Sequence, residues 1–148
     1  MERLTNLFLV FTSLFLISCG SEDDVDCSTV DCISPGIQLE FIDKESNENL
    51  LKNGTIDAED IKIEVSNIIG PNVGFNSNGE QLYVFIDNWQ DGNHDMSVQV
   101  NSDIVLEMSV DTETKRSECC SGKIISDLQI TLGEFEEIDD YYFAILID

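Results

Sequence analysis

The feature that most constrains the fold is an alternation of apolar and polar residues that starts at Ile37 and recurs to the end of the chain. It is clearest at positions 37–41 and 61–65, where every second residue is apolar. A period of two is typical of strands with one buried face. The segments 81–86, 96–100, 104–110, 124–132 and 141–147 share the apolar character of such strands.

Turn-forming residues separate these segments, and no segment has the 3.6-residue apolar spacing of a helix. The turn signals are Asn53-Gly54, Gly70-Pro71-Asn72, Asn78-Gly79, Asp91-Gly92-Asn93 and Gly133. We therefore expect about seven strands and one short helical turn near residues 58–60. This pattern predicts an all-β chain, an antiparallel β-sandwich of immunoglobulin-like or transthyretin-like kind over residues 36–148. A small closed barrel is the alternative.

The last of these segments, 141–147, is apolar on both faces. An exposed edge strand of that composition would invite aggregation, so we expect it to be paired inside a sheet or covered.

The N-terminal segment, residues 1–18, has the pattern of a secretory signal peptide. Its run of 11 mostly apolar residues from Leu7 to Ile17 is too short for a membrane span, which needs about 20, but suits a signal sequence. Leu16-Ile17-Ser18-Cys19 then resembles the lipobox of bacterial lipoproteins. The resemblance implies that the signal is removed and that Cys19 carries acyl chains, which together anchor the protein stably to a membrane.

Residues 19–35 are expected to form a tether that carries the first cysteines of the mature chain. Four acids lie between Gly20 and Asp26, and such a run is typical of a solvated, extended linker. Ser21 followed by these acids also resembles the surface-export signal of Bacteroidota-type lipoproteins. That resemblance implies display on the outer face of the outer membrane, with the periplasmic face as the alternative. As a whole the chain resembles small β-sandwich lipoproteins of such bacteria, a group that brings no established activity with it.

Four further cysteines, Cys27, Cys32, Cys119 and Cys120, suggest disulfide bonds, because an even number in an exported chain is typical of them. A bond between adjacent residues is strained. We therefore expect Cys27 and Cys32 each to bond to one of Cys119 and Cys120, and pairing within each segment is the alternative. A four-cysteine zinc site is a further alternative, although adjacent cysteines do not easily place both sulfurs on one metal.

The charge balance limits the classes of molecule that we expect the protein to bind directly. The chain has 30 acidic residues against 7 Lys and Arg, a net charge of -23. Nucleic acid and anionic lipid both need a basic face, so we expect neither as a direct partner. Contact with the membrane is expected through the anchor on Cys19 alone.

Catalytic groups are scarce. The one histidine, His94, lies in a segment that reads as a solvent-facing turn, and no nucleophile elbow, HExxH, Walker or dinucleotide motif occurs. The acid pairs Glu136-Glu137 and Asp139-Asp140 would face opposite sides of a strand. We therefore expect a non-catalytic binding or structural module of the cell envelope. The alternatives are a carboxylate-based hydrolase and a calcium-dependent adhesion or glycan-capture module.

One polar segment between strand patterns is the candidate ligand loop, with an envelope protein or a glycan as its partner. Its oxygen-bearing side chains suit Ca²⁺, although Val98 stands where an EF-hand would place its last glutamate; the alternative is a solvated acidic face. No other cofactor is expected. Trp89 could stack on a sugar or anchor a protein, or it could close the end of the core. The candidate residues are Asp87, Asn88, Trp89, Asp91, Asn93 and Asp95.

Overall fold

The computed structural model describes Cys27, Cys32 and residues 35–148. It divides the chain into two units, Met1–Val30 and Asp31–Asp148. Cys27 is the one described residue of the first unit and is exposed. The predicted signal peptide, the lipidation site at Cys19 and the acidic segment 20–26 lie outside the described residues.

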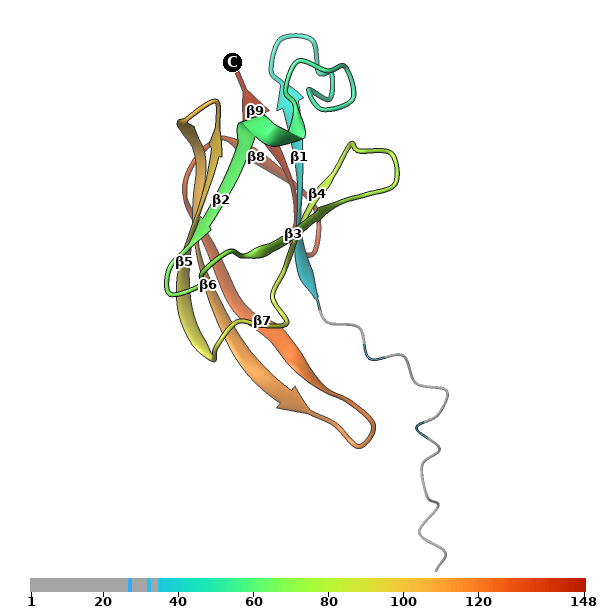
Figure 1. Ribbon diagram of the computed structural model, residues 1–148, viewed down its shortest axis with the longest axis vertical. Coiled ribbons are helices and arrows are strands. Elements are labelled where there is room, and N and C mark those ends of the chain that lie inside the picture. The colour runs from blue at the N-terminus through green and yellow to red at the C-terminus, as the bar shows by residue number, and fades with distance from the viewer. Residues whose placement is uncertain (1–26, 28–31, 33–34) are drawn as a thin grey trace, which may run out of the picture. The chain divides into compact units, whose positions relative to one another are not determined.

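The second unit is almost entirely β-structure, as the alternating sequence predicted (Figure 1). Among the described residues it has nine strands rather than the expected seven. Within residues 35–148 the helical element is the 3₁₀ turn η2, Ala58–Asp60, where a turn was expected. The strands are β1 Gly36–Asp43, β2 Ile61–Val65, β3 Asn72–Phe75, β4 Leu82–Phe85, β5 Gly92–Val100, β6 Asp103–Arg116, β7 Ser121–Leu132, β8 Phe135–Asp139 and β9 Tyr142–Ile147.

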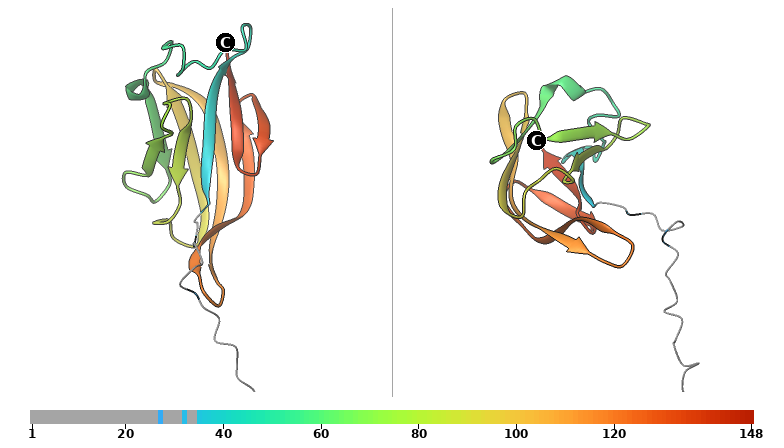
Figure 2. Two further views of the ribbon diagram at one scale, coloured as in Figure 1. Left: turned by 90° about the vertical axis from the view of Figure 1, so that its right-hand side faces the viewer. Right: turned by 60° about the horizontal axis from the view of Figure 1, so that its bottom comes forward.

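Two separate sheets face each other across the core (Figure 2). The five-stranded sheet has the order β3-β4-β1-β9-β8, and the four-stranded sheet has the order β2-β5-β6-β7. Strands β1 and β9 are parallel, and the other pairs are antiparallel. The sandwich prediction is therefore confirmed over the closed barrel. The apolar last strand, β9, is paired on both sides, as expected.

Much of the core consists of the alternating apolar residues that the sequence pattern singled out. Strand β1 buries every second side chain, and the long strands β5 and β6 do the same. These buried residues are Ile37, Leu39, Phe41, Met96, Val98, Val100, Leu106, Met108 and Val110. The polar residues between them face solvent, and on the four-stranded sheet they form the surface that contains the candidate site.

Two strands were not predicted. Strand β3 follows Gly70-Pro71 and was interpreted as part of a turn, and β8 has five exposed residues with three acids among them. Both are short edge strands, where burial imposes little pattern on the sequence. Strand β5 was expected from residue 96 but begins at Gly92, so part of the candidate ligand loop belongs to a strand.

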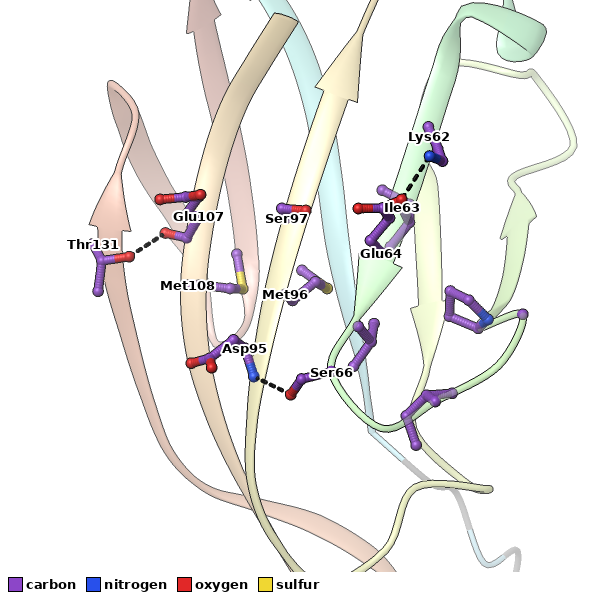
Figure 3. A pocket seen from close by; sticks show the side chains of 14 residues that line it. Lys62, Ile63, Glu64, Ser66, Asp95, Met96, Ser97, Glu107, Met108 and Thr131 are labelled. Carbon is purple, nitrogen blue, oxygen red and sulfur yellow. Dashed lines mark hydrogen bonds and ion pairs between the residues drawn. The ribbon is translucent and has the colours of Figure 1, made fainter. Parts of the chain in front are cut away.

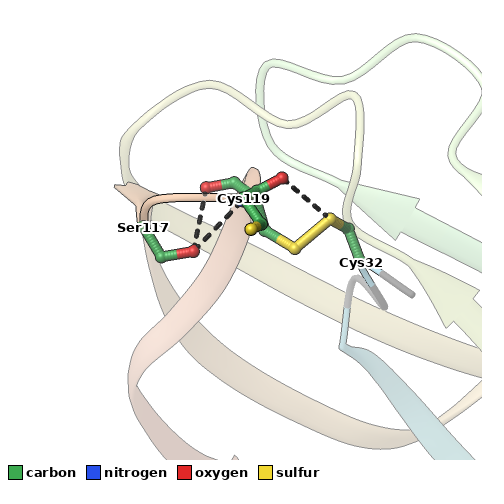
Figure 4. The surroundings of a disulfide bond; sticks show 4 residues. Cys32, Ser117 and Cys119 are labelled. Atoms are coloured by element: carbon green, nitrogen blue, oxygen red, sulfur yellow. Dashed lines mark hydrogen bonds between the residues drawn. A yellow bond between two sulfur atoms is a disulfide. The ribbon is translucent and has the colours of Figure 1, made fainter. Parts of the chain in front are cut away.

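The hairpin of β6 and β7 is the longest element and extends past the neighbouring strands (Figure 1). Its turn is closed by hydrogen bonds between Ser117 and Cys120: the Ser117 N–H donates to the Cys120 carbonyl at 2.7 Å, and the Cys120 N–H to Ser117 Oγ at 3.1 Å. At this turn a disulfide joins Cys32 to Cys120, with 5.5 Å between the Cα atoms (Figure 4).

The disulfide confirms the expectation for Cys32, because it bonds to a member of the adjacent pair. Cys27 and Cys119 are disulfide-bonded as well. Zinc binds thiolates, and a disulfide sulfur is not one, so these four residues do not form the alternative zinc site. Within the described part of the chain, no helix is long and apolar enough to cross a membrane.

Candidate functional site

The tryptophan proposed as a ligand contact is part of the core. Trp89 is 2% exposed, so its ring is not available to stack on a sugar or to anchor a partner. It closes the end of the sandwich, which was the alternative interpretation. Its indole Nε1 has no hydrogen-bond partner among the described residues.

His94 was expected in a solvent-facing turn, and this expectation is wrong. The residue lies on β5 and is 3% exposed, with its ring 5.0 Å from that of Trp89. Its Nε2 lies 2.8 Å from the Gln90 carbonyl oxygen, which also accepts a hydrogen bond from the Thr112 hydroxyl at 2.7 Å. Because β5 begins at Gly92, the inward alternation of its residues includes His94.

The remaining residues of the candidate ligand loop are exposed but do not converge. Asp87, Asn88 and Asp91 precede β5, while Asn93 and Asp95 lie on it. Across the described residues, no group of three or more His, Cys, Asp or Glu side chains is arranged to hold a metal ion.

The carboxylate of Asp91 is already paired with a cationic side chain. Its carboxylate forms an ion pair with Lys123 of β7 and accepts a hydrogen bond from the Thr114 hydroxyl at 2.8 Å. Lys123 and Thr114 lower the pKa of Asp91 because both stabilise the ionised carboxylate. The loop therefore offers a calcium ion less uncompensated charge than its sequence suggested.

A shallow groove of about 850 Å³ lies instead on the outer face of the four-stranded sheet (Figure 3). We call it the acidic groove. Its polar lining comes from β2, β5, β6 and β7 and from the residue after β2, and the loop that leads to β3 adds to its border. The polar side chains are Lys62, Glu64, Ser66, Asp95, Ser97, Glu107 and Thr131.

Strand register places the carboxylates of the groove. Glu64 on β2 is opposite Ser97 on β5, and Ser97 is opposite Glu107 on β6. Paired residues point to the same face of a sheet, so Glu64 and Glu107 flank the small side chain of Ser97. Two strand spacings put about 10 Å between the Cα atoms of Glu64 and Glu107. The backbone N–H of Asp95 donates to the Ser66 hydroxyl at 2.8 Å, which fixes the loop at the end of β2.

The groove has an excess of negative charge. Lys62 is the one cation among its described lining residues, and its Nζ lies 2.5 Å from the carboxylate of Glu64. Asp95 and Glu107 add two further carboxylates to the lining. The sequence analysis missed this site because its acids lie far apart in the chain. The signal in the sequence was the set of polar residues that alternates with the apolar residues of each strand. These polar residues lie on one face of the sheet once the strands pair.

A second polar cluster lies on the outer face of the other sheet. Glu40 accepts hydrogen bonds from the Tyr142 hydroxyl and, at 2.7 Å, from Gln81 Nε2. Burial and the adjacent carboxylate disfavour the phenolate and raise the pKa of Tyr142 to about 12. These groups satisfy one another across β1, β9 and the start of β4, so we interpret the cluster as structural.

The acid pairs near the C-terminus behave as strand and turn residues. Glu136 is opposite Ala144 and Glu137 is opposite Phe143, so the two glutamates point to opposite faces, as expected. Asp139 ends β8 and accepts a hydrogen bond from the Asp140 N–H at 2.9 Å, so this second pair lies in a turn.

No protein-family model, curated protein or solved structure matches the chain, so the evidence for its function is the geometry described above.

Proposed function

We propose that the chain is a lipoprotein of the cell envelope, anchored through Cys19 and displayed on the outer face of the outer membrane, whose sandwich is a non-catalytic binding module. Its ligand is a cationic segment of an envelope protein, bound in the acidic groove. The observation that carries this proposal is the groove lining, in which one lysine accompanies three carboxylates.

The charge of the whole chain supports a cationic ligand. A net charge of -23 produces a negative potential that accelerates the approach of a basic partner. At the groove, the partner's Lys or Arg groups would pair with Asp95 and Glu107, and Ser66, Ser97 and Thr131 would supply hydrogen bonds.

A protein ligand is favoured over a glycan by the composition of the groove. Protein sites for sugars gain much of their affinity from an aromatic ring against a sugar face. The described lining of the groove contains no aromatic side chain, and Trp89 is buried elsewhere.

Titration of the full chain, purified in detergent, with fluorescent octalysine tests the groove. The triple variant Glu64→Gln, Asp95→Asn, Glu107→Gln should bind at least tenfold more weakly than the parent. The matched control is Glu45→Gln, Glu59→Gln, Asp103→Asn, which removes three exposed acids outside the groove. An equal loss in both triple variants would show that only the net charge matters and would reject the groove as the site.

The rival function, a carboxylate-based hydrolase, has one supporting observation. Glu64 and Glu107 lie on one face of the sheet with about 10 Å between their Cα atoms by two strand spacings, and inverting glycosidases hold their two carboxyl groups about 6.5 to 9.5 Å apart. The test is hydrolysis of a panel of aryl glycosides. Turnover that disappears in both Glu64→Gln and Glu107→Gln would establish the hydrolase and reject the non-catalytic module.

A further inference from the structure

The sandwich has an open side between strands β7 and β8. These are the last strands of their sheets at the same end of the two layers, and the short connection at Gly133 links them. A cavity of about 300 Å³ lies between them, lined by residues of β7, β8 and β9 and by Tyr141. We call it the β7–β8 slot. Its lining is Ser126, Asp127, Leu128, Ile130, Phe135, Glu137, Tyr141 and Phe143.

The slot has apolar side chains from both sheets in its lining and is incompletely covered. Leu128 and Ile130 of β7 are half-buried, and Phe135 packs edge-on against Phe143 with 5.9 Å between ring centroids. Phe135 is 40% exposed at the slot, whereas the exposed Leu132 is paired with Glu107 and faces the outer surface of the four-stranded sheet. Phe135 together with the half-buried Leu128 and Ile130 leaves apolar surface open at the slot, and contiguous exposed apolar surface is typical of an interaction site.

Backbone hydrogen-bonding groups border the slot on both sides. Among the described strands, β7 pairs with β6 alone and β8 pairs with β9 alone, so each presents one edge. The Tyr141 hydroxyl donates to the Ile125 carbonyl at 3.1 Å and occupies the β7 edge at that point. The stretch of β7 from residue 126 to 132 therefore remains for pairing with an added strand.

The negative charges at the slot favour one kind of binding partner over another. Asp127 and Glu137 are the charged residues of its described lining, and Glu136 and Asp139 add carboxylates along β8. Acids on an edge strand repel a second copy of a chain whose net charge is -23. The same acids attract an extended segment that carries Lys or Arg.

We propose that the β7–β8 slot accepts an extended segment of a protein partner, which pairs with the free edge of β7 as an added strand. Alternate residues of that segment are apolar and enter the slot, and the residues between them are basic and lie on the outer face of the sheet beside Asp127, which is paired with Asp111 there. This interaction is separate from ligand binding in the acidic groove, because the two sites share no lining residue.

The test uses a fluorescent nine-residue peptide of alternating Val and Lys and the full chain in detergent. Fluorescence anisotropy should show saturable binding. Two further peptides have the same sequence with N-methyl groups on alternate amides, one peptide for each edge of the extended chain. Each keeps its side chains but loses the backbone N–H donors of one edge. We expect one of the two methylated peptides to bind at least tenfold more weakly. Equal binding of all three peptides would overturn strand addition.

Exposed substitutions locate the site with little risk to folding, which circular dichroism checks. Asp127→Lys with Glu137→Lys should weaken binding at least tenfold, while the control Glu45→Lys with Glu59→Lys makes the same charge change elsewhere. Phe135→Ser should weaken binding at least fivefold, and Ile104→Ser, another exposed apolar residue, should not. Equal effects in variant and control would reject the slot.

Two outcomes separate this proposal from others. If Glu64→Gln with Glu107→Gln abolishes binding of the alternating peptide, the peptide occupies the acidic groove and the slot proposal is wrong. If the chain without peptide sediments as a dimer that Phe135→Ser dissociates, the occupant is a second copy and not a basic partner.

Discussion

Trp89 and His94 show how burial can differ from what the neighbouring sequence suggests. Both stand among polar residues, yet their rings pack together at the end of the core. We expect Trp89→Ala to lower the free energy of unfolding by about 3 to 5 kcal/mol, because it leaves a cavity where a large ring was buried. Urea unfolding followed by circular dichroism measures this. The control Ile69→Ala, at a fully exposed residue, should change it by less than about 0.5 kcal/mol. A loss for Trp89→Ala as small as that of the control would contradict the buried position.

Tyr142 gives a prediction for alkaline pH. Its folded-state pKa of about 12 lies above the value of about 10 expected in the unfolded chain. Above pH 10 the unfolded state releases this proton and the folded state retains it, so the stabilising contribution of Tyr142 is complete below pH 10 and is lost as the pH approaches 12. Urea unfolding between pH 9 and 12 should show a fall in stability that is shallower in Tyr142→Phe.

Tyr83 provides the control for this measurement. Tyr83→Phe removes one tyrosine from the same sheet and leaves the hydrogen bond between Tyr142 and Glu40 in place, so it is the matched comparison. The absorbance of the tyrosinates at 295 nm gives an independent reading, because Tyr142→Phe should remove a tyrosine that ionises at about pH 12 in the folded protein. Identical titrations of parent and Tyr142→Phe would contradict the assigned hydrogen bonds.

At the scale of the elements, the β6–β7 hairpin depends on its disulfides. The Cys32–Cys120 bond spans 88 residues, and closing a loop of that length stabilises a domain by about 4 kcal/mol in the chain-entropy model. We expect replacement of Cys27, Cys32, Cys119 and Cys120 by Ser to lower the free energy of unfolding by up to this amount. Urea unfolding with and without reductant measures it. Reductant should destabilise the parent and leave the variant with the four serines unchanged.

The sequence predicted elements where burial imposes a pattern, and it failed where burial does not. Strands β1 and β2 were found because one face of each packs on the core, and η2 was found from its turn residues. Strands β3 and β8 were missed because their side chains are mostly exposed. The early start of β5 was missed because Gly92 resembled a turn residue, and this error placed His94 in a loop.

The candidate site was less predictable than the fold. The loop chosen from sequence contains acids that are close in the chain, but Asp91 is paired with Lys123 from β7. The acidic groove combines Glu64, Asp95 and Glu107, which only strand pairing brings together. Local sequence reports neighbours along the chain, whereas a site on a sheet is assembled across strands.

For the whole molecule, the proposed lipid anchor makes a direct prediction. Cys19→Ala should move the protein from the membrane fraction to the soluble fraction in a native host, because the acyl chains have no other attachment site in the proposal. The intact mass of the protein should decrease by the mass of the lipid. Cys19→Ser is a useful companion, since it also lacks the thiol. Membrane retention of both variants would reject the anchor.

Surface display is tested separately from anchoring. Brief protease treatment of intact cells should remove the parent protein. Replacing Glu22, Asp23 and Asp24 by Ala should protect it, because the proposed export signal depends on these acids. A matched control replaces the exposed acids Glu45, Glu59 and Asp103 and should remain protease-accessible. Loss of the parent and the variant at equal rates would contradict the export signal.

The position of the Cys32–Cys120 bond also has a mechanical consequence. Cys32 lies four residues before the start of β1, and its bond leads to the turn of the longest hairpin. A pulling force applied from the N-terminal side, such as drag from flowing liquid on a tethered molecule, passes through a covalent link into β6 and β7 before it reaches β1. Tension is therefore carried by two long strands, and β1 is not peeled away from β4 and β9 one hydrogen bond at a time.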